Sequence, residues 1–245
     1  MRGLSVKEPG MRPPNPLPTE QDHNAPPINP LPVSVVLLAL AIFGVELVLT
    51  AAGAGFVGGP AGTGWRLHAL EQYGFYEPLM NWMVENRMIR WEFALRFLTF
   101  PFVHGTFTHA LFVLVFLLAM GKLVGEVLAD WAVLAIFFGA SFLGALAYGF
   151  VWDTRVMLFG GFPGAYGLVG GFTFILWAGL AGRATGLQAF TLIAFLMGIQ
   201  LIFGLFVGGS LDWVADLAGF VAGFAIAFLV SPGGWDAVLR RLRRR

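Results

Sequence analysis

The chain has 245 residues, of which 58% are hydrophobic and only 12% are charged, with a formal net charge of +1. A typical soluble domain carries roughly a quarter charged residues, so this chain has too little charge to cover a surface that faces water. The composition therefore excludes a soluble globular protein and predicts an integral membrane protein. Because the chain has no cysteine, disulfide bonds and thiolate chemistry are excluded as well.

The first 32 residues are polar and contain nine of the fourteen prolines. Such a segment buries too little apolar area to offset the entropy lost on ordering, and its prolines favour extended conformers. We expect residues 1–32 to be a disordered, proline-rich cytoplasmic tail. A ligand for a proline-binding domain is the alternative interpretation of this segment.

Six apolar stretches follow, each close to the roughly 20 residues that a membrane-spanning helix needs. They cover approximately residues 33–56, 107–128, 131–152, 161–181, 188–209 and 213–231. The intervening piece at 58–105 mixes four basic and four acidic residues with aromatic side chains, which is typical of amphipathic structure at the membrane interface. The predicted fold is an all-α membrane domain at 33–231, with six transmembrane helices and a long interfacial loop between the first two.

The basic residues favour a cytoplasmic location for both chain ends. Six spans place the two termini on one side, and cytoplasmic loops carry an excess of Lys and Arg. With the termini inside, ten basic residues face the cytoplasm, including five in the tail at 232–245, and five face the other side. The arginine-rich tail is interpreted as an anchor on anionic lipid headgroups rather than a nucleic-acid-binding segment. The expected location is a bacterial inner membrane, with the lipid bilayer as a partner and no nucleic acid.

Glycines recur at short intervals in the fourth and sixth apolar stretches. The positions are Gly161, Gly164, Gly167 and Gly170 in the fourth, and Gly219 and Gly223 in the sixth. In lipid, small residues allow helix backbones to approach closely and gain dispersion contacts. The fourth and sixth helices are therefore expected to pack tightly against each other.

Polar side chains within a membrane are costly, so each of them is a functional candidate. They are Glu46 in the first stretch, His104 and His109 at the start of the second, and Asp216 at the start of the sixth. Glu46 is expected to face the bundle or the outer interface with a partner such as Arg96.

Three segments together resemble the rhomboid family of intramembrane serine proteases. They are "RFLTFPFVHGTFTHALFVLVFLLAMG" (96–121), "GFPGAYGLVGG" (161–171) and "ADLAGFVAGF" (215–224). The resemblance implies a six-helix core over about residues 33–231. It also implies a catalytic serine in a Gly-x-Ser-Gly motif, a catalytic histidine in a His-x-x-Gly-x-x-x-Gly motif, and an asparagine four residues after a histidine that helps to hold the oxyanion.

The sequence departs from the family pattern at all three of these positions. Pro163 stands at the serine, Asp216 at the catalytic histidine, and Val113 at the asparagine that follows His109. Acyl transfer needs a nucleophile beside a base and donors aimed at the oxyanion. Proline has neither a hydroxyl nor a backbone N–H, but it is well tolerated in the first turn of a helix. We therefore expect the fold to survive and the chemistry to be lost.

Two alternative roles for residues of this region are disfavoured, a substitute catalytic serine and a metal site. Ser141 lies in "GASFLG", in the middle of a span and without the following glycine, so it is expected to be a packing residue bonded to its own helix. A divalent metal site formed by His104, His109 and Asp216 is disfavoured, because the two histidines are five residues apart, a poor spacing for two ligands on one helical face. Asp216 is instead expected to pair with His109 or a water near the start of its helix. No cofactor is expected.

The resemblance, taken with the three departures from the family pattern, implies a proteolytically inactive rhomboid relative. By analogy, it would bind transmembrane segments of client proteins near a gate between the second and fifth spans and affect their stability or assembly. An active intramembrane endopeptidase with a non-standard site is the first alternative. A structural subunit of a larger membrane complex is the second. A transporter or channel is disfavoured, because few ionisable residues lie deep in the spans.

Overall fold

The computed structural model describes residues 30–151, 156–179, 186–207 and 212–231, together with positions 233, 239 and 243. The chain divides into two units, Met1–Pro30 and Leu31–Arg245. The helices of the described ranges belong to the second unit. The expected tail at 1–32 and the basic tail at 232–245 lie almost entirely outside the described residues.

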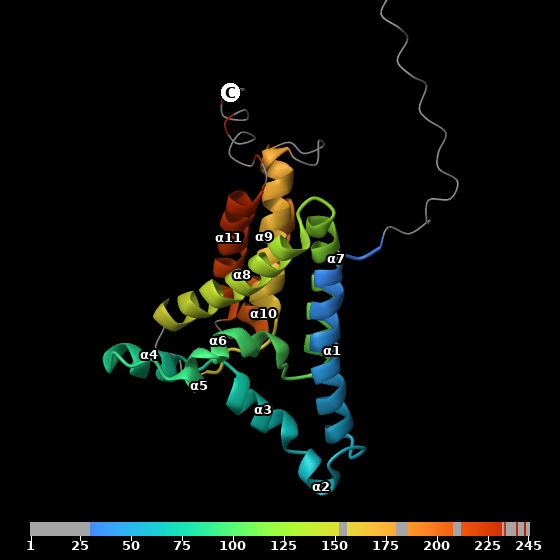
Figure 1. The fold of residues 1–245 in the computed structure, drawn as a ribbon, viewed down its shortest axis with the longest axis vertical. Coiled ribbons are helices and arrows are strands. Elements are labelled where there is room, and N and C mark those ends of the chain that lie inside the picture. The colour runs from blue at the N-terminus through green and yellow to red at the C-terminus, as the bar shows by residue number, and fades with distance from the viewer. Residues whose placement is uncertain are drawn as a thin grey trace, which may run out of the picture. The chain divides into compact units, whose positions relative to one another are not determined.

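The second unit is built from helices (Figure 1). In the described ranges its long helices are α1 (Val33–Gly53), α7 (Phe107–Gly125), α8 (Asp130–Val151), α9 (Phe162–Ala178), α10 (Thr191–Val207) and α11 (Asp212–Val230). Between α1 and α7 lie α2 (Gly59–Gly62), α3 (Trp65–Tyr73), α4 (Glu77–Glu85), α5 (Trp91–Ala94), α6 (Arg96–Thr99) and the 3-10 turn η1 (Phe100–Phe102), and a second turn, η2 (Gly186–Phe190), precedes α10. The part of the chain that the structure describes has one isolated β-bridge, Phe75 with Leu158, and no strand, so the predicted all-α fold is confirmed.

Four of the described helices are long and apolar enough to cross a membrane, namely α1, α7, α8 and α11. The apolar helix α9 has 17 residues and the apolar segment Leu187–Ile199 is shorter still. At 1.5 Å per residue, 17 residues extend about 26 Å, slightly less than the hydrocarbon core of roughly 30 Å. Each predicted apolar stretch corresponds to one long helix, while the crossing of the membrane by all six stays a prediction.

Helix α9 lies among the other long helices and is buried along nearly its whole length. Its residues from Pro163 to Gly171 are all buried, and it packs against α11, α8 and α7. A helix that is apolar on every side is suited to such a position, because it has no face to present to water. The start of α9 is therefore held by three neighbours at once.

The four glycines of this segment contact different neighbours. Each residue turns a helix by about 100°, so a step of three residues leaves successive positions about 60° apart. A Cβ at Gly164 would lie 2.7 Å from the ring of Phe137 on α8, whereas a Cβ at Gly170 would overlap the backbone of Phe220 on α11. The glycines at 164 and 170 therefore contact different helices, α8 and α11, and Gly161 precedes the helix as its N-cap.

Helices α9 and α11 approach backbone to backbone. A Cβ at Gly219 would overlap the carbonyl of Pro163 and lie 3.1 Å from its Cα. One turn further on, a Cβ at Gly223 would lie 2.5 Å from the Cα of Gly167. The Gly-x-x-x-Gly spacing thus removes side chains at the two points where the helices touch.

Candidate functional site

A cavity of about 290 Å³ lies where α9 and α11 begin. It is lined by His109 of α7, Leu158 and Phe159 before α9, Phe162 and Pro163 of α9, and Asp212 and Asp216 of α11. Three positions singled out in the sequence, 109, 163 and 216, therefore meet at one site. Asp212 was missed, although its four-residue spacing from Asp216 places both side chains on one face of the helix.

Pro163 occupies the second position of α9 and is buried. The helix begins normally around it, because the N–H of Ala165 donates to the carbonyl of Gly161 at 2.9 Å. Proline suits this place, since the N–H that it lacks would have no partner within the helix. The residue therefore completes the fold but supplies neither a hydroxyl nor an amide N–H to the cavity.

Helix α8 lies close to both Pro163 and the start of α11. A Cβ at Gly144 of α8 would lie 3.1 Å from the Cβ of Pro163 and 2.7 Å from the carbonyl oxygen of Ala215. The following residue, Asp216, is only 2% exposed and is the fifth residue of α11. A carboxylate near a helix N-terminus is electrostatically favoured. The side chain of Asp216 thus lies near the start of α11, at a cavity that it shares with a proline that has no proton to give.

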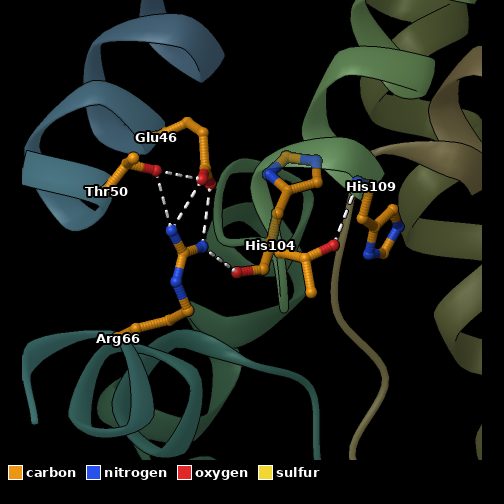
Figure 2. A network of polar contacts seen from close by, with 6 residues as sticks. Glu46, Thr50, Arg66, His104 and His109 are labelled. Carbon is orange, nitrogen blue, oxygen red and sulfur yellow. Dashed lines mark hydrogen bonds and ion pairs between the residues drawn. The ribbon is translucent and has the colours of Figure 1, made fainter. Parts of the chain in front are cut away.

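His104 and His109 lie edge to face, with ring centroids 5.1 Å apart (Figure 2). The ring of His109 stacks on Phe162, with 5.2 Å between centroids and 19° between planes. His104 is fully buried, and its Nε2 accepts a hydrogen bond from the N–H of Gly161 at 3.3 Å. Since Nε2 accepts, the proton of the neutral ring sits on Nδ1. Burial, together with the nearby His109, lowers the pKa of His104 to about 4, so this imidazole is neutral at neutral pH.

Positions 161, 163 and 113 provide no hydrogen-bond donor for an oxyanion. Pro163 has no N–H. Val113 is fully buried and apolar, and its Cγ1 lies 2.8 Å from where a Cβ of Gly161 would be. The N–H of Gly161 is already bonded to His104. At these positions the cavity offers no preorganised donor to a developing negative charge.

A buried ion pair joins α1 to the segment that precedes α7 (Figure 2). Arg66 of α3 donates from Nη2 to Oε1 of Glu46 at 2.6 Å and from Nη1 to Oε2 at 3.0 Å. The same Nη1 donates to the carbonyl of His104 at 2.7 Å, and Thr50 donates to Glu46 at 2.8 Å. Arg66 therefore links Glu46 to the backbone of His104, the residue whose side chain accepts the hydrogen bond from Gly161.

The expected pairing of Glu46 with Arg96 is wrong, because Arg66 occupies that place. The segment after α1 turns back along α1, which brings residue 66 beside residue 46. Arg96 instead donates to the carbonyl of Gly74 at 3.0 Å and so holds the segment between α1 and α7 together. The sequence alone does not determine how far the chain turns back, so any basic residue of that segment was a candidate partner for Glu46.

The serines within the described ranges do not line the cavity. Ser141 is buried in α8 and donates to the carbonyl of Phe137 at 2.8 Å, which confirms the prediction that it bonds to its own helix. Ser34 donates to Asp130 at 2.7 Å at the far end of α8. Within the same ranges, no group of three or more His, Asp or Glu side chains is arranged to hold a metal ion. The weaker metal alternative at positions 104, 109 and 216 thus gains no support.

The comparison with known families points to one of them. Residues 91–233, more than half of the chain, match the sequence model of the Rhomboid domain. The matched range contains α7, α8, α9, α10 and α11 and every residue that lines the cavity. No curated protein matches the chain.

Proposed function

This chain belongs to the rhomboid family, and we propose that it is a proteolytically inactive member that binds transmembrane segments of other membrane proteins and affects their stability or assembly. It is an integral membrane protein built of apolar helices. The observation that carries the proposed inactivity is the pairing of Pro163 with the start of α11, beside a carboxylate in place of an imidazole.

Inactivity follows from the groups that the cavity contains. Serine-type hydrolysis requires a hydroxyl, a base within hydrogen-bond reach and donors for the oxyanion. Residue 163 is a proline, so Asp216 has no hydroxyl at that position to deprotonate. Of the two imidazoles nearby, that of His104 is engaged with Gly161. Rescue by Ser141 is disfavoured by the bond from its hydroxyl to its own helix.

Binding of a client helix is supported by the packing of α10. Within the described residues, α10 packs mainly on η2, α11 and α9. On α10, the side chain of Phe195 is 64% exposed, and on α7 that of Phe112 is 55% exposed. These rings have lipid or another helix as their neighbours in a membrane. We therefore place the client-binding surface along α7 and α10, beside the cavity.

The proposed topology completes this account. All six long helices cross the membrane, both termini are cytoplasmic, and the segment at 58–105 lies at the opposite interface. The domain limits are 1–32, 33–231 and 232–245, and the expected membrane is a bacterial inner membrane. The basic residue counts support this orientation.

Site-specific photo-crosslinking in the native membrane tests the binding proposal. A photoreactive residue at Phe112 or Phe195 should crosslink to transmembrane segments of other proteins. The matched control is Leu229 of α11, which is 76% exposed but lies near the end of the bundle away from the cavity. Equal crosslinking from all three positions would contradict a defined client surface. One stoichiometric partner at every position would favour the structural-subunit alternative.

A further inference from the structure

We propose that the hydrogen bond between His104 and Gly161 is an acid-sensitive latch, which holds the start of α9 at neutral pH and releases it when His104 takes up a proton. The segment just before α9 contributes Leu158 and Phe159 to the cavity, so release of the latch also loosens one side of the cavity. The latch is independent of the proposed function, because it operates whether or not the protein binds client segments.

The segment before α9 is held mainly by backbone hydrogen bonds to the part of the chain between α1 and α7. Leu158 exchanges two such bonds with Phe75, both of 2.9 Å. The N–H of Gly160 donates to the carbonyl of Phe100, also at 2.9 Å. Peptide groups do not titrate between pH 4 and pH 7, so these bonds persist when the pH falls over that range.

The next bond along the chain has a titratable acceptor. The N–H of Gly161 donates to Nε2 of His104 at 3.3 Å, and both residues are buried. A protonated imidazole carries hydrogen on both ring nitrogens and can accept at neither. Protonation therefore places two donors opposite each other and removes this bond. Gly161 is the N-cap of α9, so the lost bond is the one at the start of the helix, directly before Phe162 and Pro163 of the cavity.

The charges around His104 do not favour a protonated ring (Figure 2). Burial, His109 of α7 and Arg66 of α3 oppose the proton, whereas Glu46 of α1 and the backbone of Phe102 in η1 favour it. Glu46 is already paired with Arg66, and Arg66 also donates to the carbonyl of His104 at 2.7 Å. A second cation beside this ion pair is a buried charge without its own counterion, which is costly. The protonated ring is therefore expected to leave its place.

The pH range of the latch follows from the two states of His104. Its pKa is about 4 while the latch is closed and returns towards 6.5 when the ring is released. The released state thus binds more protons, so acid favours release. Between pH 7 and pH 4.5 the equilibrium should shift towards release by about 50-fold. In the proposed topology this segment lies on the side away from the cytoplasm, so the latch responds to the external pH.

Hydrogen–deuterium exchange of the full chain in lipid nanodiscs tests the latch. Protection of the Gly161 amide, corrected for the intrinsic exchange rate at each pH, should fall by about 50-fold between pH 7 and pH 4.5. Amides in the middle of α8 should keep their protection. In His104→Gln the acceptor does not titrate, so protection at Gly161 should stay within a few-fold. His109→Gln is the matched control, because it removes the neighbouring imidazole and should retain the response to acid.

Three results would overturn the proposal. Unchanged protection of Gly161 at pH 4.5 in the wild-type protein would show that acid does not release the bond. An equal loss of protection in the wild type and in His104→Gln would show that another group senses the acid. Loss of protection in α8 to the same extent would mean that the whole bundle opens. If His104→Gln fails to fold, His104→Asn gives the same comparison, and the contrast between Gly161 and α8 in the wild type still separates local release from unfolding.

Discussion

The carbonyl of Pro163 on α9 faces Gly219 on α11 so closely that no side chain fits between them. This contact fixes the start of α9 against the start of α11, where Asp216 lies one turn before Gly219. Pro163 and Asp216 therefore line one cavity, and neither of them carries a hydroxyl or an imidazole. The fold and the chemistry of this site are separable properties.

Adding a methyl group at this contact should destabilise the bundle. Gly219→Ala places a Cβ against the backbone of Pro163, which cannot move aside by rotating a side chain. Overpacking of this kind costs about 1–3 kcal/mol or more. The free energy of unfolding in detergent micelles should fall by that amount. Gly44→Ala on α1 is the control, because nothing lies within 4 Å of its Cβ position. An equal effect of both substitutions would show that α9 and α11 do not touch at residue 219.

Restoring the two family residues should not restore proteolysis. In the Pro163→Ser and Asp216→His double variant, the hydroxyl and imidazole return, but Val113 still provides no amide donor and the Gly161 N–H remains bonded to His104. Loss of one oxyanion donor alone lowers kcat by about 10²–10³. Cleavage of a permissive transmembrane substrate should stay at background. Adding Val113→Asn tests the explanation, and robust cleavage by the double variant alone would contradict it.

Breaking the buried ion pair should be costly. Arg66→Ala leaves the carboxylate of Glu46, which is 1% exposed, without its cation. Removal of one partner from a buried pair costs about 3–5 kcal/mol, and the lower end applies because Arg66 keeps 23% of its side chain exposed. The unfolding midpoint in denaturant measures this loss. Glu92→Gln, which breaks the exposed pair with Arg90, should have no measurable effect.

The stability of the protein should fall in mild acid because of His104. Its pKa is about 4 in the folded chain and 6.5 in the unfolded chain, so the unfolded state binds more protons between these values. The contribution of His104 to the free energy of unfolding is complete above pH 6.5 and is lost as the pH falls towards 4. The difference between the two pKa values corresponds to about 3 kcal/mol.

Comparison with His104→Gln isolates this effect, since other groups also titrate in that range. Glutamine keeps an acceptor for the Gly161 N–H but does not bind a proton. The wild-type protein should lose more stability between pH 7 and pH 4.5 than the variant does. Parallel curves for the two proteins would show that His104 is not buried in its neutral form.

The apolar helices and the chemistry of positions 163 and 216 are predictable from sequence because they depend on local properties. Hydropathy over about 20 residues defines a helix that can cross a membrane, and proline lacks a hydroxyl in any fold. The glycine spacing likewise indicates close packing. Successive glycines differ in direction by about 60°, so Gly164 faces α8 and Gly170 faces α11, but this is known only once the positions of those helices are known.

The contacts that the sequence did not reveal depend on how the segment before α7 folds back. Arg66 reaches Glu46 across 20 residues, and His104 reaches Gly161 across 57. Neither pairing has a signature in spacing or composition, because several basic residues and two histidines were equally available. Asp212 is different, since its spacing from Asp216 indicated a shared helix face and was overlooked.

The most direct measurement of the central claim is covalent labelling of the wild-type protein, reconstituted in liposomes, with a fluorophosphonate serine probe alongside a permissive transmembrane substrate. We predict neither labelling nor cleavage, while an active rhomboid protease treated in the same way gives both. Labelling and cleavage that are both abolished by replacing one particular serine would contradict the claim that position 163 has left this site without a nucleophile.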